Sequence, residues 1–206
     1  MNETGRIIYV DNNATTRIAP EVLEAMLPYL NEYYGNPGSI HTFGGQVAHA
    51  VEKARLQLAG LLGASHRNAE GEATEVIFTS CGTESDNAAI WSALLTQPER
   101  RKIVTSKVEH PAVLNLAREL ERRGFEIEAI GVDGRGRIDL EAVRKAVDAN
   151  TALLTVMYAN NEIGNIYPVE ELADIAHRQG ALFHTDAVQA VGKVPLDLGN
   201  SNIDML

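Results

Sequence analysis

The sequence has almost no cysteine, no long apolar run and no excess of basic residues. Its one cysteine, Cys81, excludes an internal disulfide and favours a reducing compartment. No apolar run approaches the roughly 18 residues of a membrane span, and the N-terminal segment lacks the apolar core of a signal peptide. A formal net charge of −10 argues against a nucleic-acid partner. We therefore expect a cytoplasmic protein that binds neither nucleic acid nor membrane.

A regular alternation of strand-like and helix-like segments occupies most of the chain. The predicted strands are Glu75–Thr79, Lys102–Ser106, Glu126–Val132, Ala152–Tyr158 and Ala181–Asp186. The helices predicted between them are Gly82–Leu95, Pro111–Arg123, Asp139–Val147 and Pro168–Gln179. Alternation of this kind predicts an α/β fold, with a mainly parallel sheet and helices on both faces.

The two ends of the sequence depart from this alternation. Before it come a strand-like run, two helices and a polar loop, predicted at Ile7–Val10, Pro20–Tyr33, Gly44–Leu62 and His66–Thr74. Asn202–Leu206 reads as the start of another buried strand, which predicts that the chain is the front part of a longer protein. We expect an N-terminal segment over residues 1–15 and one partial domain over residues 16–206.

Four polar clusters follow predicted strands. They are Thr79–Thr83, Glu109–His110, Asn160–Glu162 and Asp186. Because ligands of open α/β sheets bind beyond the carboxyl ends of the strands, these clusters predict one site.

Each cluster has a functional and a structural interpretation. Gly82 and Thr83 open a helix whose free N–H groups suit a phosphate, although a Ser/Thr helix cap explains the same residues. His110 suits stacking on an aromatic ligand or proton transfer, but it also suits an unliganded helix start. Asn161 can donate to a phenolate oxygen or simply form a turn.

Asp186 separates the two interpretations best. A carboxylate at the end of a buried strand is costly without a cationic partner, and a protonated ring nitrogen is one such partner. A helix cap or an ion pair to an arginine is the alternative. Gln189 lies three residues further on and faces the same way if a helical turn begins at Asp186.

Together the clusters offer a phosphate cradle, a ring stacker, a donor for a ring oxygen and a carboxylate for a ring nitrogen. Pyridoxal phosphate is the cofactor that combines these groups. It also needs a Schiff-base lysine, and none of the five lysines is well placed: Lys53, Lys102, Lys107, Lys145 and Lys193.

Six segments in order resemble the pyridoxal-phosphate-dependent cysteine desulfurases of the class V aminotransferase family, closely the NifS type. They are Asp11–Thr16, Gly35–Ser39 with His41, Thr79–Asn87, Glu109–Val113, Asn160–Gly164 and His184–Lys193. The resemblance covers essentially the whole chain. It implies the large domain of the aspartate-aminotransferase fold (fold type I), a homodimer, and sulfur transfer from L-cysteine that leaves L-alanine and an enzyme persulfide.

The resemblance also implies roles for individual residues. Gly82 and Thr83 would hold the phosphate, and His110 would stack on the ring and move protons. Asn161 would lie near the ring oxygen and Gln189 would bind it, while Asp186 would pair with the ring nitrogen. The catalytic residues would be His110 and Asp186, with no metal ligand. The sulfur acceptor would be an iron–sulfur scaffold protein of the NifU kind, serving nitrogenase.

Two residues that the family needs are expected beyond Leu206. They are the Schiff-base lysine and the cysteine that carries the persulfide, so the resemblance implies that this chain alone is inactive. Cys81 would be a packing residue beside the phosphate loop. Two alternatives stay open: a related pyridoxal-phosphate enzyme, such as an aminotransferase or selenocysteine lyase, and a non-catalytic fragment or partner-binding module.

Overall fold

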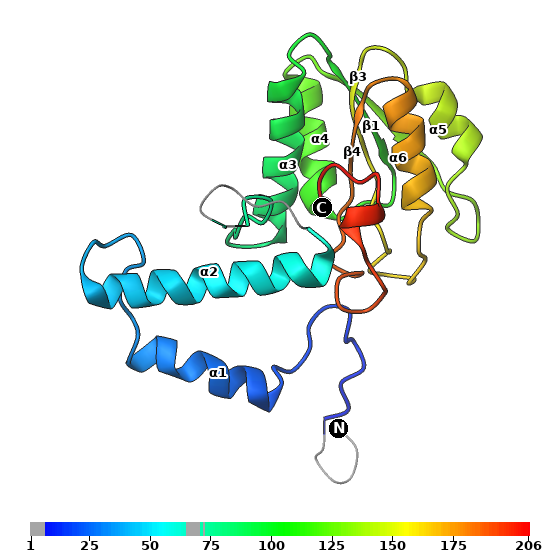
Figure 1. Cartoon of the computed structure of the whole chain (residues 1–206). Helices are drawn as coiled ribbons and strands as arrows, with labels where there is room; N and C mark the ends of the chain where they lie inside the picture. The colour runs from blue at the N-terminus through cyan, green and yellow to red at the C-terminus, as the bar shows by residue number, and fades with distance from the viewer. Residues whose placement is uncertain (1–6, 65–70, 72) are drawn as a thin grey trace. The chain divides into compact units, whose positions relative to one another are not determined.

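The computed structural model describes residues 7–64, 71 and 73–206 (Figure 1). The chain forms two compact units, residues 1–77 and 78–206. The division predicted after residue 15 stays a prediction, and most of the predicted loop His66–Thr74 lies outside the described residues.

The first unit contains two helices, α1 (Pro20–Asn31) and α2 (Thr42–Leu62). Helix α2 starts where the Nδ1 atom of His41 accepts a hydrogen bond from the N–H of Gly44, at 3.1 Å. It ends at Gly63, whose φ of 74° favours glycine because a Cβ is strained there. Both predicted helices are therefore confirmed, with ends shifted by up to two residues.

The predicted strand Ile7–Val10 is wrong. These four residues pair with no strand in the described part of the chain, and their exposed fractions run from 51% to 81%. The apolar face of α1 is likewise not buried, since Met26 and Leu27 are 43% and 46% exposed.

The second unit contains a four-stranded parallel sheet. Its strands are β1 (Lys102–Ser106), β2 (Glu126–Ile130), β3 (Thr151–Thr155) and β4 (Leu182–His184). They lie in the order β2-β1-β3-β4. The register places Val104 beside Glu128 on one side and Leu154 on the other, and Leu154 beside Phe183.

Helices cover both faces of this sheet, as predicted. Ile103 and Leu153 face one way and pack against α3 (Gly82–Thr96) and α4 (Pro111–Arg122). Their neighbours Val104 and Leu154 face the other way, because side chains alternate along a strand.

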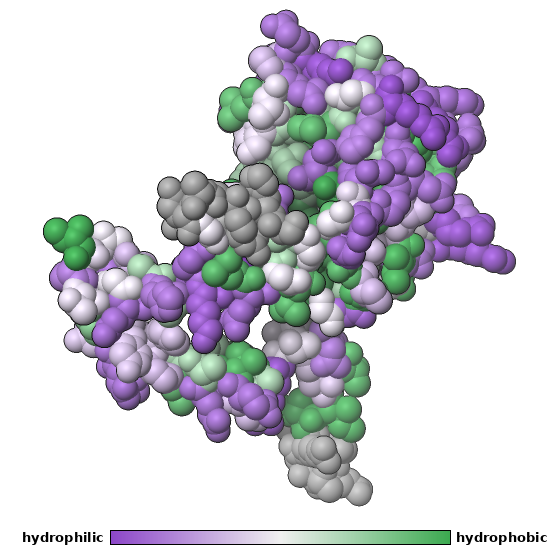
Figure 2. All heavy atoms as spheres, viewed as in Figure 1, coloured by the Kyte–Doolittle hydropathy of each residue, from purple (hydrophilic) through white to green (hydrophobic). Residues whose placement is uncertain are grey.

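The second face packs against α5 (Leu140–Ala146) and α6 (Val169–Arg178). Helix α6 buries Leu172 and Ala176 on the sheet, and Figure 2 shows mostly polar side chains over the outer side of α5 and α6. A short 3₁₀ helix, Leu198–Asn200, follows β4.

The predicted helix ends are largely confirmed. The carboxylate of Asp139 accepts hydrogen bonds from the N–H groups of Glu141 and Ala142, at 2.9 and 3.3 Å, and so caps α5. Gly124 and Gly180 follow α4 and α6 with φ values of 84° and 68°. Pro168 precedes α6 rather than opening its first turn.

One further strand prediction fails, and another is confirmed only in part. Glu75–Thr79 forms no strand in the described part of the chain, and Ile77 and Phe78 are 80% and 46% exposed. Asn202–Leu206 contributes only one parallel bridge, from Met205 to His184. A strand needs a partner along its length, and an apolar run alone does not supply one. No helix among the described residues is both long and apolar enough to cross a membrane.

Candidate functional site

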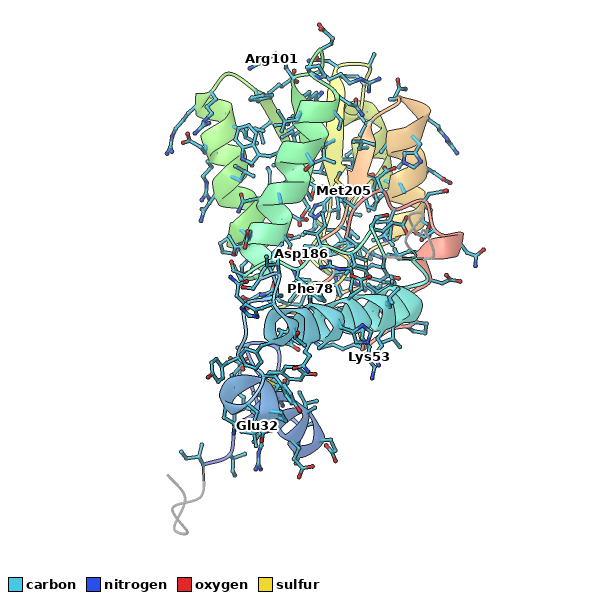
Figure 3. All side chains as sticks on the ribbon, turned by 60° about the vertical axis from the view of Figure 1, so that its left-hand side comes forward. Glu32, Lys53, Phe78, Arg101, Asp186 and Met205 are labelled. Atoms are coloured by element: carbon cyan, nitrogen blue, oxygen red, sulfur yellow. The ribbon has the colours of Figure 1, made fainter. Side chains whose placement is uncertain are left out.

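The candidate site lies at the carboxyl ends of the parallel strands. Ser106, Thr155 and His184 are the last residues of β1, β3 and β4, so the loops after them start at one edge of the sheet. In Figure 3 Asp186 lies near this edge and Arg101 near the opposite one.

The connections diverge between β1 and β3. Helix α4, which follows β1, covers one face, whereas α6, which follows β3, covers the other. A crevice forms where connections diverge in this way, and ligands of open α/β sheets bind there.

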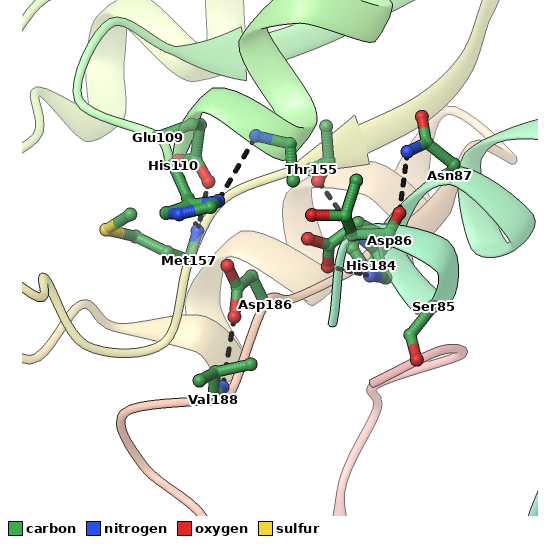
Figure 4. A network of polar contacts seen from close by, with 12 residues as sticks. Ser85, Asp86, Asn87, Glu109, His110, Thr155, Met157, His184, Asp186 and Val188 are labelled. Atoms are coloured by element: carbon green, nitrogen blue, oxygen red, sulfur yellow. Dashed lines mark hydrogen bonds and ion pairs between the residues drawn. The ribbon is translucent and has the colours of Figure 1, made fainter. Parts of the chain in front are cut away.

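Three carboxyl groups from distant segments meet at this edge. Asp86 comes from α3, Glu109 follows β1 and Asp186 follows β4 (Figure 4). Burial, together with the charge of Asp186, raises the pKa of Asp86 to about 7. Burial also raises the pKa of Glu109 to about 8, and the charges of Asp186 and Asp86 act in the same direction.

In the described part of the chain, no lysine or arginine forms an ion pair with any of these three carboxyl groups. The nearest basic atom is Nε2 of His184, 3.7 Å from Oδ1 of Asp86. That separation would suit an ion pair, but burial lowers the pKa of His184 to about 4. We therefore infer that the histidine is uncharged near neutral pH and leaves the carboxyl cluster uncompensated.

His184 is held from its other ring nitrogen. Nδ1 lies 2.8 Å from the hydroxyl oxygen of Thr155, so the last side chains of β3 and β4 are joined by a hydrogen bond. This contact fixes the end of β4, two residues before Asp186.

Glu109 joins the ends of β1 and β3. Its two carboxyl oxygens accept from the backbone N–H of Met157, at 3.1 and 3.0 Å, and the hydroxyl of Ser106 donates to Oε1. Only 5% of Glu109 is exposed. The residue therefore spans the place where the chain connections diverge.

His110 follows Glu109 and caps α4. Its Nδ1 atom accepts a hydrogen bond from the N–H of Ala112 at 3.1 Å, and Pro111 fixes the first turn. In the neutral imidazole the proton then resides on Nε2, because Nδ1 is the acceptor. The residue is exposed, so the ring is anchored at one nitrogen while its surface stays accessible.

The start of α3 touches the loop that carries Asp186. A Cβ added to Gly82 would lie 3.3 Å from Cγ2 of Val188, which is a tight contact. The N–H of Val188 in turn donates to Oδ1 of Asp186 at 3.0 Å. The structure thus brings the predicted phosphate turn beside the predicted ring-nitrogen carboxylate.

The remaining predicted residues have local contacts. Asn161 lies in a turn held by Asn160, and its Nδ2 atom is 3.5 Å from Oε1 of Glu162. Gln189 is half-buried, and its Oε1 atom accepts from the exposed ammonium group of Lys193.

The hydroxyl of Ser80, which lies two residues before Gly82, donates a hydrogen bond to the carboxylate of Glu84. Glu84 also accepts from the N–H of Ser80, and both contacts lower its pKa. Thr83 is exposed at the start of α3.

Asp86 is the residue that sequence reasoning missed. It shares the buried face of α3 with Ile90, Ala93 and Leu94, at spacings of four, seven and eight residues. A carboxylate on the apolar stripe of a helix is a usable signal, because charged residues are rarely buried there without a reason.

The site therefore has the chemistry that pyridoxal phosphate requires. An uncompensated group of carboxyls suits a cationic ring nitrogen, and the N-terminus of a 15-residue helix with a glycine at its first position suits a phosphate. An exposed imidazole anchored at the same edge suits stacking.

Comparisons with known proteins agree with this chemistry. The aminotransferase class-V family model matches residues 8–206. A cysteine desulfurase of Trichormus azollae is 55% identical over 200 residues, which are 97% of this chain and 48% of that protein. Cysteine desulfurase NifS of Azotobacter vinelandii is 52% identical over 199 residues, again 97% of this chain and 48% of that protein.

Solved structures give the same result. A NifS-like protein aligns with a TM-score of 0.87 and 40% identity, over 96% of this chain and 53% of that one. The chain spans about half the length of the curated relatives it matches. The fold, the family model and these identities together show that the chain belongs to the class-V aminotransferases, a family of pyridoxal-phosphate enzymes.

Proposed function

We propose that the protein containing this chain is a cysteine desulfurase. It would take sulfur from L-cysteine onto a cysteine thiol of the enzyme, which yields L-alanine and an enzyme persulfide. The names of the similar proteins support this reaction. The observation that carries the proposal is the cluster of three carboxyl groups, Asp86, Glu109 and Asp186. This cluster lies beside the start of α3 and beside His110.

The site residues divide between binding and proton transfer. Gly82 and Thr83 would hold the phosphate at the helix N-terminus. Asp186 would accept a hydrogen bond from the protonated ring nitrogen, and Asn161 and Gln189 would serve the ring oxygen. When bound, pyridoxal phosphate withdraws electrons from the substrate's α-carbon.

The other chain residues set the electrostatics. Asp186 keeps the proton on the ring nitrogen, and the nearby Asp86 and Glu109 favour positive charge at the same place. His110 would stack on the ring and would hold or move a proton at Nε2.

The finer parts of the proposal concern partners. The protein would act in the cytoplasm as a homodimer and would pass its sulfur to an iron–sulfur scaffold protein of the NifU kind, serving nitrogenase. Similarity to a cysteine desulfurase named NifS supports this choice.

The test uses the protein expressed from its full gene, with L-cysteine and pyridoxal phosphate. With an added dithiol, which reduces the persulfide and releases its outer sulfur, we expect alanine and sulfide in equal amounts, and we expect Asp186→Ala to lose most of the rate. Asp174→Ala, an exposed acid on α6, is the matched control and keeps the rate. Equal rates for the wild type and Asp186→Ala would refute the role of Asp186.

Three other outcomes would refute the desulfurase proposal itself. Transamination without sulfide release would indicate an aminotransferase. Turnover of selenocysteine but not of cysteine would indicate a selenocysteine lyase, and no turnover with either substrate would favour a partner-binding protein.

A further inference from the structure

Glu109 makes contacts that its place in the sequence does not require. It follows β1 after two loop residues, yet both carboxyl oxygens reach the N–H of Met157, two residues after β3. The same carboxyl group accepts from the hydroxyl of Ser106, at the end of its own strand. The side chain thus bridges the ends of β1 and β3.

The bridge uses an expensive group. Glu109 is 5% exposed, and no lysine or arginine in the described part of the chain is paired with it. Burial without a cation raises its pKa to about 8, so the buried group is largely protonated at neutral pH. Since the protonated group can still accept the hydrogen bond from the N–H of Met157, its geometric role can be tested apart from its charge.

The loop that Glu109 anchors is the loop that presents His110. On the β2 side, the N–H of Lys107 donates to the carbonyl of Ile130 at 2.8 Å. On the β3 side, two contacts hold the same loop. Glu109 accepts from the N–H of Met157, and the side-chain amide of Asn160 donates to the carbonyl of Val108 at 3.3 Å.

We propose that Glu109 is a positioning residue for His110: its bridge to Met157 and Ser106 fixes the backbone immediately before His110 and so orients the imidazole that would contact the cofactor ring. The inference rests on the proposed function of the site. Ala112 holds the imidazole from the helix side, and Glu109 holds the backbone immediately before it.

Two substitutions separate the bridge from the charge. Glu109→Gln keeps an acceptor oxygen for Met157 and retains the length of the side chain. Glu109→Met has a similar length and suits burial, but it accepts no comparable hydrogen bond. Lys102→Met is the matched control, because Lys102 is a buried charge at the opposite end of β1, paired with Glu126, Glu128 and Asp148.

The experiment is a double-mutant cycle in the full-gene protein loaded with pyridoxal phosphate. It measures kcat/KM for alanine formation and the visible circular dichroism of the bound cofactor. We expect Glu109→Met to lower kcat/KM by about 10- to 100-fold and to change the dichroism band. Glu109→Gln keeps the wild-type band, because it retains an acceptor for the N–H of Met157, and Lys102→Met lowers thermal stability without changing the band.

The cycle with His110→Ala decides between positioning and a general structural effect. If Glu109 acts through His110, the double variant Glu109→Met/His110→Ala is no slower than His110→Ala alone, because the imidazole is already lost. Multiplicative losses, or an unchanged dichroism band in Glu109→Met, would overturn the proposal. Ser106→Ala gives the same cycle from the other end of the bridge should Glu109→Met not fold.

Failure of the underlying function gives a different result. A wild type that binds pyridoxal phosphate but makes no alanine refutes the desulfurase proposal alone. The dichroism bands of Glu109→Met, His110→Ala and the double variant still test positioning in that case. Identical bands for the three variants support it, and a wild-type band in Glu109→Met overturns it.

Discussion

Replacing Glu109 with glutamine should remove a specific pH dependence from the stability of the protein. The pKa of Glu109 is raised from 4.5 to about 8 in the folded state because the carboxyl is buried. Between these two values the folded state holds a proton that the unfolded state has lost. The free energy of unfolding therefore falls as the pH rises through this range, and the fall ends above the folded-state pKa.

The size of the effect follows from the size of the shift. Below the folded-state pKa, each unit by which the pH rises lowers the free energy of unfolding by about 1.4 kcal/mol. The free energy of unfolding of the wild type should therefore fall by roughly 2–3 kcal/mol between about pH 6 and about pH 9. Asp86, with its pKa raised to about 7, acts in the same direction at the lower end of this range. His184, with its pKa lowered to about 4, acts oppositely, but only below its ordinary value of 6.5.

The assay is denaturant unfolding of the full-gene protein without added cofactor, followed by far-ultraviolet circular dichroism. Above about pH 6.5, we expect the free energy of unfolding of Glu109→Gln to depend much less on pH than that of wild type. At about pH 9 the variant should be the more stable of the two. Glu121→Gln, an exposed acid on α4, is the control and should run parallel to wild type. Parallel curves for Glu109→Gln and wild type would show that Glu109 is ionised at neutral pH and would refute the reasoning.

Three other predictions test the surroundings of the site. Cys81→Ala should keep most desulfurase activity, because Cys81 lies at the start of α3 and not on a loop that could carry its thiolate to the substrate. Loss of persulfide formation with the cofactor still bound would contradict this. Thr105→Val should raise the free energy of unfolding by about 1 kcal/mol, because the buried hydroxyl of Thr105 has no hydrogen-bond partner among the described residues. A lower melting temperature in the variant would contradict this prediction. Binding of pyridoxal phosphate should release protons near pH 7, because a cationic ring at Asp186 would lower the pKa of Asp86 and Glu109. Calorimetry in two buffers of different ionisation enthalpy measures the number of protons released. This number should be smaller for Glu109→Gln, and equal numbers would contradict the prediction.

Local signals were enough to predict the second unit. Strand β1 has the predicted ends, and β2, β3 and β4 lie within their predicted ranges apart from one residue at the start of β3. The helix ends are also set by local features, namely the cap by Asp139 and the positive φ values of Gly124 and Gly180. Ile7–Val10 and Glu75–Thr79 failed because an apolar run becomes a strand only where a neighbour offers its N–H and C=O groups.

The site was predictable in outline but not in its contacts. Polar residues that follow parallel strands had to meet at one edge of the sheet. Gly82 and Asp186 do lie close together there, because Val188 packs beside Gly82 and donates its N–H to Asp186. The bridge from Glu109 to Met157 depends on which residue of β3 pairs with which residue of β1. That register joins segments about 50 positions apart, and no local pattern encodes it.

The concentration of acid at the site is a consequence of topology. Asp86, Glu109 and Asp186 come from three segments spread over a hundred residues, and each alone would read as an ordinary cap, loop or helix acid. Parallel strands that end at one edge bring them together, and burial, with the charge of Asp186, then raises the pKa of Asp86 and Glu109. A ligand with a cationic group at Asp186 relieves this repulsion, whereas a neutral ligand of the same shape does not. On the proposed function, Asp86 and Glu109 would therefore favour the cationic form of the ring nitrogen without having to touch it.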